Sequence, residues 1–186
     1  MTAIESIAAA ITLFSVWLST RQHIVSWPTA IAGVSIYAWI FWQTRLYADF
    51  GLQFVFITLS IYGWYEWLYG GEQRSQLRVS RAPLRTHLIA SAITIAFAAV
   101  LGTLLHRHTD ASLPYADAAL ASASLLAQWQ MTRKYLENWI LWIVVDVFYI
   151  VMYASKELYV TAGLYAVFIV VCAVGWRDWR RELRAA

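Results

Sequence analysis

Residues 138–153 read NWILWIVVDVFYIVMY, an apolar run that contains one acid, two tryptophans and two tyrosines. Spacings of three and four residues place these polar and aromatic side chains on one face of a helix. The members of this face are Trp139, Trp142, Asp146, Tyr149 and Tyr153. A carboxylate in the middle of a membrane helix costs roughly 2.5–3.5 kcal/mol, so we expect Asp146 to face an internal cavity. Aromatic rings above and below an acid favour a stacking site for a flat, electron-poor or cationic ligand.

The composition around this run is that of an integral membrane protein. Of the 186 residues, 61% are hydrophobic and only 13% are charged, so lipid must cover much of the surface. Eleven Trp and eleven Tyr, many near the ends of apolar runs, fit aromatic belts at two membrane interfaces. The formal charge of +3 is small and dispersed, which argues against a nucleic-acid partner. We expect no cofactor and no metal site, because the single Cys172 lies in an apolar run and no His lies at a helix centre.

Seven apolar segments have the length of about 17–25 residues that a membrane-spanning helix needs. Their approximate ranges are 4–20, 26–43, 50–69, 87–105, 116–132, 138–154 and 159–176. The sequence therefore predicts an all-α membrane protein with seven transmembrane helices. We divide the chain into a first three-helix bundle (1–69), a cytoplasmic loop with a linker helix (70–115), a second three-helix bundle (116–179) and a cytoplasmic tail (180–186). The stretch WRDWRRELRAA (176–186) looks like a basic helix end at the membrane surface.

The basic residues give a predicted orientation. Eleven of the fourteen Lys and Arg fall in the first, third and fifth links and at the C-terminus. The other three are Arg45, Arg107 and Lys156. The positive-inside rule then places the N-terminus outside and the C-terminus in the cytoplasm. We expect a multi-pass protein of the bacterial inner (cell) membrane.

The chain also contains an internal repeat. A shift of 112 positions aligns residues 27–67 with 139–179 without a gap, and 13 of the 41 pairs are identical. The identical pairs include Trp27 with Trp139 and the Gly-Trp-x-x-Trp ends at 63–67 and 175–179. We interpret the chain as two parallel three-helix units, and the helix between them restores the orientation of the second copy. Parallel repeats with a site near mid-membrane are a known transporter plan.

Positions that are polar in only one copy are the better candidates for a site. Asp146 aligns with Val34, and Trp142 aligns with Ala30. The predicted substrate-binding residues are Asn138, Trp139, Trp142, Asp146, Tyr149, Gln53 and Gln128. Structural roles stay open for several of them: Asp146 as an acid paired with a Tyr or Gln, Trp139 as an interfacial anchor, and the glutamines as interhelical hydrogen-bond partners.

Two stretches resemble the PnuC-type vitamin transporters, a family of the SWEET-like class. They are SWPTAIAGVSIYAWIFWQTRLYADFGLQFVFITLSIYGWYEW (26–67) and RKYLENWILWIVVDVFYIVMYASKELYVTAGLYAVFIVVCAVGWRDW (133–179). The resemblance implies a three-one-three helix arrangement, a homotrimer and facilitated diffusion of nicotinamide riboside. It also implies that the Trp-x-x-Trp pair, Trp139 and Trp142, contacts the nicotinamide ring. Asp146 stands where several family members have Asn, so thiamine, another flat cation, remains an alternative substrate.

The expected mechanism follows from the same residues. The vitamin ring lies against the tryptophans, Asp146 offsets its charge, and the two bundles rock about the site. Because no nucleotide-binding loop is present, we expect a cytosolic ribosylnicotinamide kinase to trap the substrate by phosphorylation and to supply NAD biosynthesis. A membrane enzyme or assembly subunit is the rival interpretation. It would need a nucleophile, a metal cluster or an acid–base pair near a membrane face, and the sequence offers none.

Overall fold

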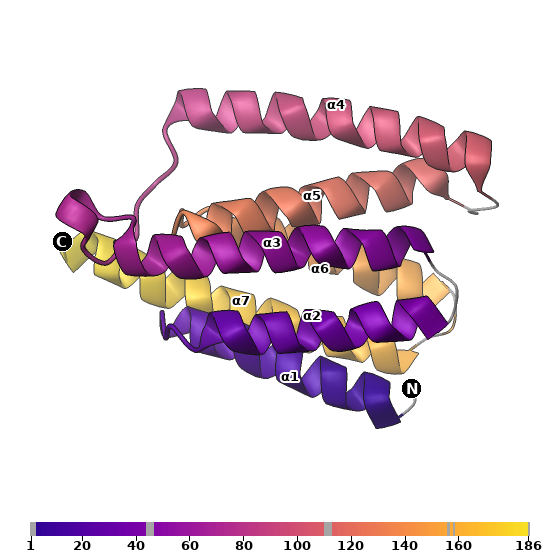
Figure 1. Cartoon of the computed structure of the whole chain (residues 1–186), viewed down its shortest axis with the longest axis horizontal. Coiled ribbons are helices and arrows are strands. Elements are labelled where there is room, and N and C mark those ends of the chain that lie inside the picture. The colour runs from indigo at the N-terminus through magenta and orange to yellow at the C-terminus, as the bar shows by residue number, and fades with distance from the viewer. Residues whose placement is uncertain (1–2, 44–46, 110–112, 156, 158, 186) are drawn as a thin grey trace.

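The computed structural model describes residues 3–43, 47–109, 113–155, 157 and 159–185, and these ranges form a helical bundle (Figure 1). Among the described residues there are seven α-helices and one short 3-10 turn, η1, at Glu72–Arg74. The α-helices are α1 (Ala3–Thr20), α2 (Ser26–Gln43), α3 (Tyr47–Tyr69), α4 (Leu84–His108), α5 (Pro114–Thr132), α6 (Asn138–Ser155) and α7 (Tyr159–Ala185). Each predicted apolar segment coincides with one of these helices. Arg45 and Lys156, which contributed to the predicted orientation, lie outside the described residues.

Six of the helices form a closed ring, and α4 lies outside it (Figure 1). Around the ring, α1 packs on α2, α2 on α3, α3 on α5, α5 on α6, α6 on α7, and α7 on α1. Helix α4 packs on α5, and Gly102 permits the close approach, because a Cβ there would lie 2.6 Å from Cδ1 of Tyr115. Its outer face is apolar, with Ile93 64% and Ile95 70% exposed. Such a face is stable in lipid rather than in water.

Four helices are long and apolar enough to cross a membrane by length and composition alone. They are α1, α4, α6 and residues Thr161–Ala185 of α7. Helices α2, α3 and α5 have 18, 23 and 19 residues, which is also a spanning length. Their mean hydropathy is lower because α2 and α3 are rich in Trp and Tyr and α5 carries several Ser and Gln. The described residues thus form an all-helical structure in which four helices have the length and composition of membrane spans.

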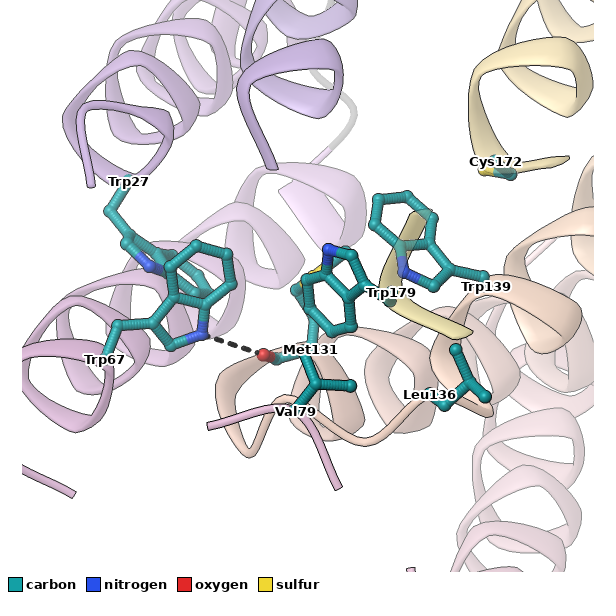
Figure 2. Close-up of a cluster of buried hydrophobic side chains, with 8 residues drawn as sticks. All are labelled: Trp27, Trp67, Val79, Met131, Leu136, Trp139, Cys172 and Trp179. Carbon is teal, nitrogen blue, oxygen red and sulfur yellow. Dashed lines mark hydrogen bonds between the residues drawn. The ribbon is translucent and has the colours of Figure 1, made fainter. Parts of the chain in front are cut away.

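Four tryptophans gather at one end of the ring, and we call them the tryptophan quartet: Trp27, Trp67, Trp139 and Trp179 (Figure 2). Each is at most 3% exposed. Trp27 meets Trp67 edge to face with 5.1 Å between centroids, and Trp139 meets Trp179 in the same way at 5.3 Å. Such T-shaped pairs are favourable beyond the area they bury. The quartet closes this end of the ring, where α1, α3, α5 and α7 terminate.

Hydrogen bonds across the ring stabilise the same end. The indole N–H of Trp67 donates to the carbonyl of Met131 at 3.0 Å (Figure 2), and that of Trp179 donates to the carbonyl of Ser19 at 3.3 Å. Arg133, just after α5, donates to the Glu66 carboxylate on α3 at 2.9 Å. These contacts join α3 to α5 and α7 to α1, which are the two places where residues 1–69 meet residues 116–179.

The segment between α3 and α4 (residues 70–83) packs against the bundle and forms hydrogen bonds with it. The amide of Ser80 donates to the carbonyl of Lys134 at 3.1 Å, and the amide of Leu136 donates to the carbonyl of Ser80 at 2.9 Å. Val79 is 7% exposed and packs with the tryptophan quartet. The link before α4 thus covers the link before α6.

The last helix extends beyond the predicted apolar segment. Helix α7 continues to Ala185, whereas the apolar run ends near residue 176. Trp179 is fully buried, Leu183 packs against the quartet, and the Arg180 guanidinium lies over the Trp176 ring at 4.7 Å. The predicted tail therefore belongs to a helix whose inner side is part of the core.

Candidate functional site

Asp146 is a buried carboxylate in the middle of α6. It is 5% exposed, and it makes no hydrogen bond or ion pair within the described part of the chain. It lies close enough to Cys172 on α7 to influence that thiol electrostatically. An unpaired buried carboxylate is costly, because its desolvation is not compensated by a partner. The alternative of a structural acid paired with a Tyr or Gln is thus not supported by its contacts.

The face of α6 that carries Asp146 points toward the inside of the ring. Tyr149, one turn further on, interacts with Ser124 on α5 and contacts Tyr165 on α7 with ring centroids 4.9 Å apart. Since α5 and α7 flank α6 in the ring, a residue that contacts both must face inward. Tyr153 continues the face and stacks on Tyr165 at 5.4 Å. The spacing of residues in the sequence predicted this shared face correctly.

The two tryptophans of this face have different surroundings. Trp139 is fully buried at the start of α6, against Trp179 and Gly175, and its indole N–H has no partner among the described residues. Trp27 has the same arrangement against Trp67 and Gly63 in the other half. Trp142 lies one turn deeper, at the edge of the quartet, and is only partly buried. A packing role therefore suffices for Trp139, whereas the Trp142 ring is available for a ligand.

Asn138 and the two glutamines have polar contacts of different kinds. The Asn138 amide is fully buried and donates to the carbonyl of Tyr135 at 2.6 Å. Gln128 on α5 donates to the Ser60 hydroxyl on α3 at 3.5 Å, a long hydrogen bond that joins the two halves. Gln53 donates to the carbonyl of Asp49 within its own helix at 3.2 Å. The structure thus joins Gln128 to α3 by a hydrogen bond, whereas Gln53 has no hydrogen bond to α5, α6 or α7 among the described residues.

Residues outside the predicted set also lie along this face. Ser60 is 1% exposed, and it follows Gln53 by seven residues, a spacing that shares one helix face. Tyr165 on α7 joins Tyr149 and Tyr153, and Tyr37 on α2 lies near it from the opposite half. The repeat contained a signal for these positions, because Tyr37 aligns with Tyr149 and Gln53 with Tyr165.

A buried ammonium group, that of Lys134, lies outside the membrane-spanning segments. Lys134, in the link between α5 and α6, is 6% exposed, and burial lowers the pKa of its ammonium group to about 8 against the opposing influence of Glu182. It donates to the Gln22 side chain at 2.8 Å and lies 4.6 Å from the centroid of the Trp67 ring.

In the described residues, no three His, Cys, Asp or Glu side chains gather as metal ligands.

Comparisons with known proteins agree with this architecture. The nicotinamide riboside transporter PnuC of Escherichia coli is 26% identical over 206 residues, covering 97% of this chain and 86% of the relative. The riboflavin/roseoflavin transporter RibM of Streptomyces davaonensis is 24% identical, covering 92% and 84%. The crystal structure of the vitamin B3 transporter PnuC superposes with a TM-score of 0.76 at 22% identity, covering 98% of this chain and 82% of that one.

These relatives are transporters, not enzymes. The model of the nicotinamide mononucleotide transporter family matches residues 2–181, nearly the whole chain. The chain belongs to the nicotinamide mononucleotide transporter family.

Proposed function

We propose that this protein carries nicotinamide riboside into the cytoplasm by facilitated diffusion. The observation that carries the proposal is the unpaired carboxylate of Asp146, 5% exposed on the inner face of α6. A flat cation is the ligand that this carboxylate and the neighbouring Trp142 ring would bind together, since cation–π contacts in desolvated sites contribute ~2 kcal/mol. Family membership and the nicotinamide riboside transporters among its relatives support this substrate.

The site then has one acid, one open indole ring and a border of amides and hydroxyls. The nicotinamide ring would lie against Trp142 while Trp139 supports that ring from the core. Tyr149 and Gln128 would supply hydrogen bonds to the carboxamide and ribose, with Asn138 and Gln53 as further predicted contacts. Polar groups placed in this way fix the orientation of a small ligand in a largely apolar pocket.

Riboflavin is disfavoured by the same carboxylate. RibM is described as a riboflavin/roseoflavin transporter, so the family includes a relative with a larger flat vitamin. The flavin ring is neutral and would leave Asp146 without a counter-charge, which is unfavourable in a desolvated site. Thiamine is a flat cation and remains the second candidate on the evidence of Asp146.

We infer that the two halves are parallel repeats that rock about this site. The 112-residue offset maps the α3–α5 contact onto α7–α1, and it maps the Trp67–Met131 bond onto Trp179–Ser19. This pairing supports seven crossings in a three-one-three arrangement. The basic residues at the quartet end favour a cytoplasmic location for that end, with the N-terminus outside. Opening toward the cytoplasm would then require the quartet to separate.

Net uptake in this proposal comes from chemistry inside the cell. A cytosolic ribosylnicotinamide kinase would add a phosphate, and the resulting negative charge would oppose return past Asp146. We also propose a homotrimer, with the exposed apolar face of α4 available for lipid or for a neighbouring subunit. Crosslinking in native membranes tests the trimer, and uptake in a kinase-deficient host, which should fall to simple equilibration, tests the trapping.

The experiment that tests the substrate and the site is a binding titration of the purified protein. Nicotinamide riboside, thiamine and riboflavin are added separately, and quenching of tryptophan fluorescence is recorded. We expect saturable quenching by nicotinamide riboside at low micromolar concentration, lost in Trp142→Ala and in Asp146→Ala. Trp39→Ala is the matched control, because that ring is 58% exposed on α2 and should leave binding unchanged. Full binding by the Trp142→Ala protein would exclude the proposed site.

A further inference from the structure

A hollow of about 380 Å³ opens where the α1–α2 link meets α7, at the quartet end of the bundle. Its charged lining consists of Arg21 from the link and of Arg177, Asp178, Arg181 and Glu182 from α7. The α7 residues follow one another at spacings of one, three and one, so they share one side of the helix. Three arginines therefore line one space that is large enough for a small ligand.

The two acids in the lining are already engaged. The Asp178 carboxylate accepts a hydrogen bond from Arg177 at 3.2 Å, and the Glu182 carboxylate accepts one from the Gln22 amide. Arg21 and Arg181 have no ion pair within the part of the chain that the structure describes. Three arginines and two acids leave the lining with a net charge of +1. The guanidinium groups of Arg21 and Arg181 have no carboxylate partner there, and guanidinium donors match the oxygens of an oxyanion in a fork-like geometry.

The other half of the protein supplies an internal comparison, which uses the repeat proposed above. Under the 112-residue offset, Arg133 and Glu66 correspond to Arg21 and Asp178, and they form an ion pair of 2.9 Å. Tyr65 and Tyr69 stand where the α1–α7 contact has Arg177 and Arg181. The α3–α5 contact is therefore neutralised, and the α1–α7 contact is not. The excess positive charge is specific to one side of the bundle and is not required by the shared fold.

We infer that this hollow binds a phosphate-bearing anion. The ligand chemistry is a phosphate mono- or diester group held by Arg21 and Arg181, with Arg177 as a further donor. Such a ligand would bridge the first half, through the α1–α2 link, to α7 of the second half. It would stabilise the contact that also contains the Trp179–Ser19 hydrogen bond.

The phosphate group could belong to an acidic phospholipid or to a soluble molecule. Phe14 and Trp17 on α1 stack with 5.9 Å between centroids and are 50% and 45% exposed, one to two turns before Arg21. Exposed aromatic rings beside a basic cluster are typical of a membrane interface, where basic pockets between helices bind acidic headgroups. These rings favour the phospholipid.

Thermal unfolding of the purified protein, without any vitamin present, tests the site. In the first arm, inorganic phosphate is titrated in neutral detergent at constant ionic strength. In the second arm, the protein is placed in nanodiscs of phosphatidylcholine alone or mixed with phosphatidylglycerol. The test variant is Arg21→Gln/Arg181→Gln, and the matched control is Arg74→Gln/Arg78→Gln, which removes the same charge from exposed residues outside the hollow.

We expect phosphatidylglycerol to raise the Tm of the wild-type and control proteins by about 2–4 °C, and to leave the test variant unchanged. The same pattern with inorganic phosphate alone would assign the site to a soluble phosphate compound. Equal responses of all three proteins, or no response of the wild type in either arm, would overturn the inference. If the double variant does not fold, Arg181→Gln alone gives the same comparison. Because no vitamin is used, this result is independent of the transported substrate.

Discussion

The indole N–H of Trp67 donates to the main-chain carbonyl of Met131 at 3.0 Å, across the boundary between the two halves. Trp179 makes the corresponding bond to the carbonyl of Ser19 at 3.3 Å, and both partners are displaced by 112 residues. Helix α3 thus binds the end of α5, and α7 binds the end of α1. Each carbonyl lies near a helix C-terminus and also accepts a main-chain amide: Lys134 donates to Met131 at 3.1 Å, and Gln22 donates to Ser19 at 3.0 Å.

Removal of either indole N–H should destabilise the bundle by a similar amount. In Trp67→Phe and Trp179→Phe, a carbonyl loses one of its two donors, and the loss of one hydrogen bond costs about 0.5–1.5 kcal/mol. Thermal unfolding in detergent measures the loss as a lower Tm. Trp64→Phe is the control, since its ring is 38% exposed and should change the Tm little. A loss confined to one member of the pair would contradict the equivalence of the two contacts.

The glycines of the quartet provide a second matched set. A Cβ at Gly175 would lie 2.6 Å from Cε2 and Cζ2 of Trp139, and a Cβ at Gly63 would overlap the Trp27 ring. Gly63→Ala and Gly175→Ala should therefore each cost about 1–3 kcal/mol through overpacking. Gly51 and Gly163 are the control pair, with no atom within 4 Å of an added Cβ. Alanine there should be neutral or stabilising by up to ~1 kcal/mol, because it favours the helix.

The positions of the helices could be predicted from the sequence, but the packing of the last helix could not. Apolar runs of spanning length predicted every helix, because lipid exposure leaves a compositional signal that needs no knowledge of tertiary contacts. The basic helix end WRDWRRELRAA was predicted at the membrane surface, but not its buried inner side, since its charges obscure Trp176, Trp179 and Leu183. That spacing of three and four residues was visible, but hydropathy alone does not detect an amphipathic end.

The candidate site was only partly predictable for a physical reason. Helical spacing assigned Trp139 and Trp142 to one face correctly, but it does not report how deeply each ring is packed. Depth depends on the facing helix: Gly175 leaves room for the Trp139 ring, whereas Trp142 packs at the edge of the quartet and is only partly buried. Ser60 escaped notice because a serine in an apolar helix is common, and only its hydrogen bond with Gln128 distinguishes it.

Lys134 predicts a pH dependence of stability. Burial lowers the pKa of its ammonium group from 10.5 to about 8, so the folded protein binds this proton less tightly than the unfolded chain. The cost of burying the charge is fully present below pH ~8 and is relieved as the pH rises toward 10.5, so this residue makes stability increase with pH in that window. The shift corresponds to at most ~3 kcal/mol.

The comparison of wild type with Lys134→Met isolates this contribution from other titrating groups. We expect the substitution to raise Tm relative to wild type most below pH ~8, and the difference in Tm to shrink as the pH rises. The lost hydrogen bond to Gln22 lowers the Tm of the variant and reduces this gain. Thermal unfolding at several pH values between 7 and ~10 measures it. Parallel Tm curves for the two proteins would exclude Lys134 as the source.

Asp146→Asn separates the charge of the site from its shape. The amide keeps the size and hydrogen-bonding capacity of the side chain but removes the counter-charge to a bound cation. Loss of one charge interaction in a partly desolvated site should weaken binding of nicotinamide riboside about tenfold, or ~1.4 kcal/mol, and thiamine by a similar factor. The affinity for a neutral flat ligand such as riboflavin should not fall, so it should rise relative to the affinities for the cations. The ratio of the Kd values from fluorescence titration measures this selectivity, and an unchanged ratio would show that Asp146 does not read the charge of the substrate.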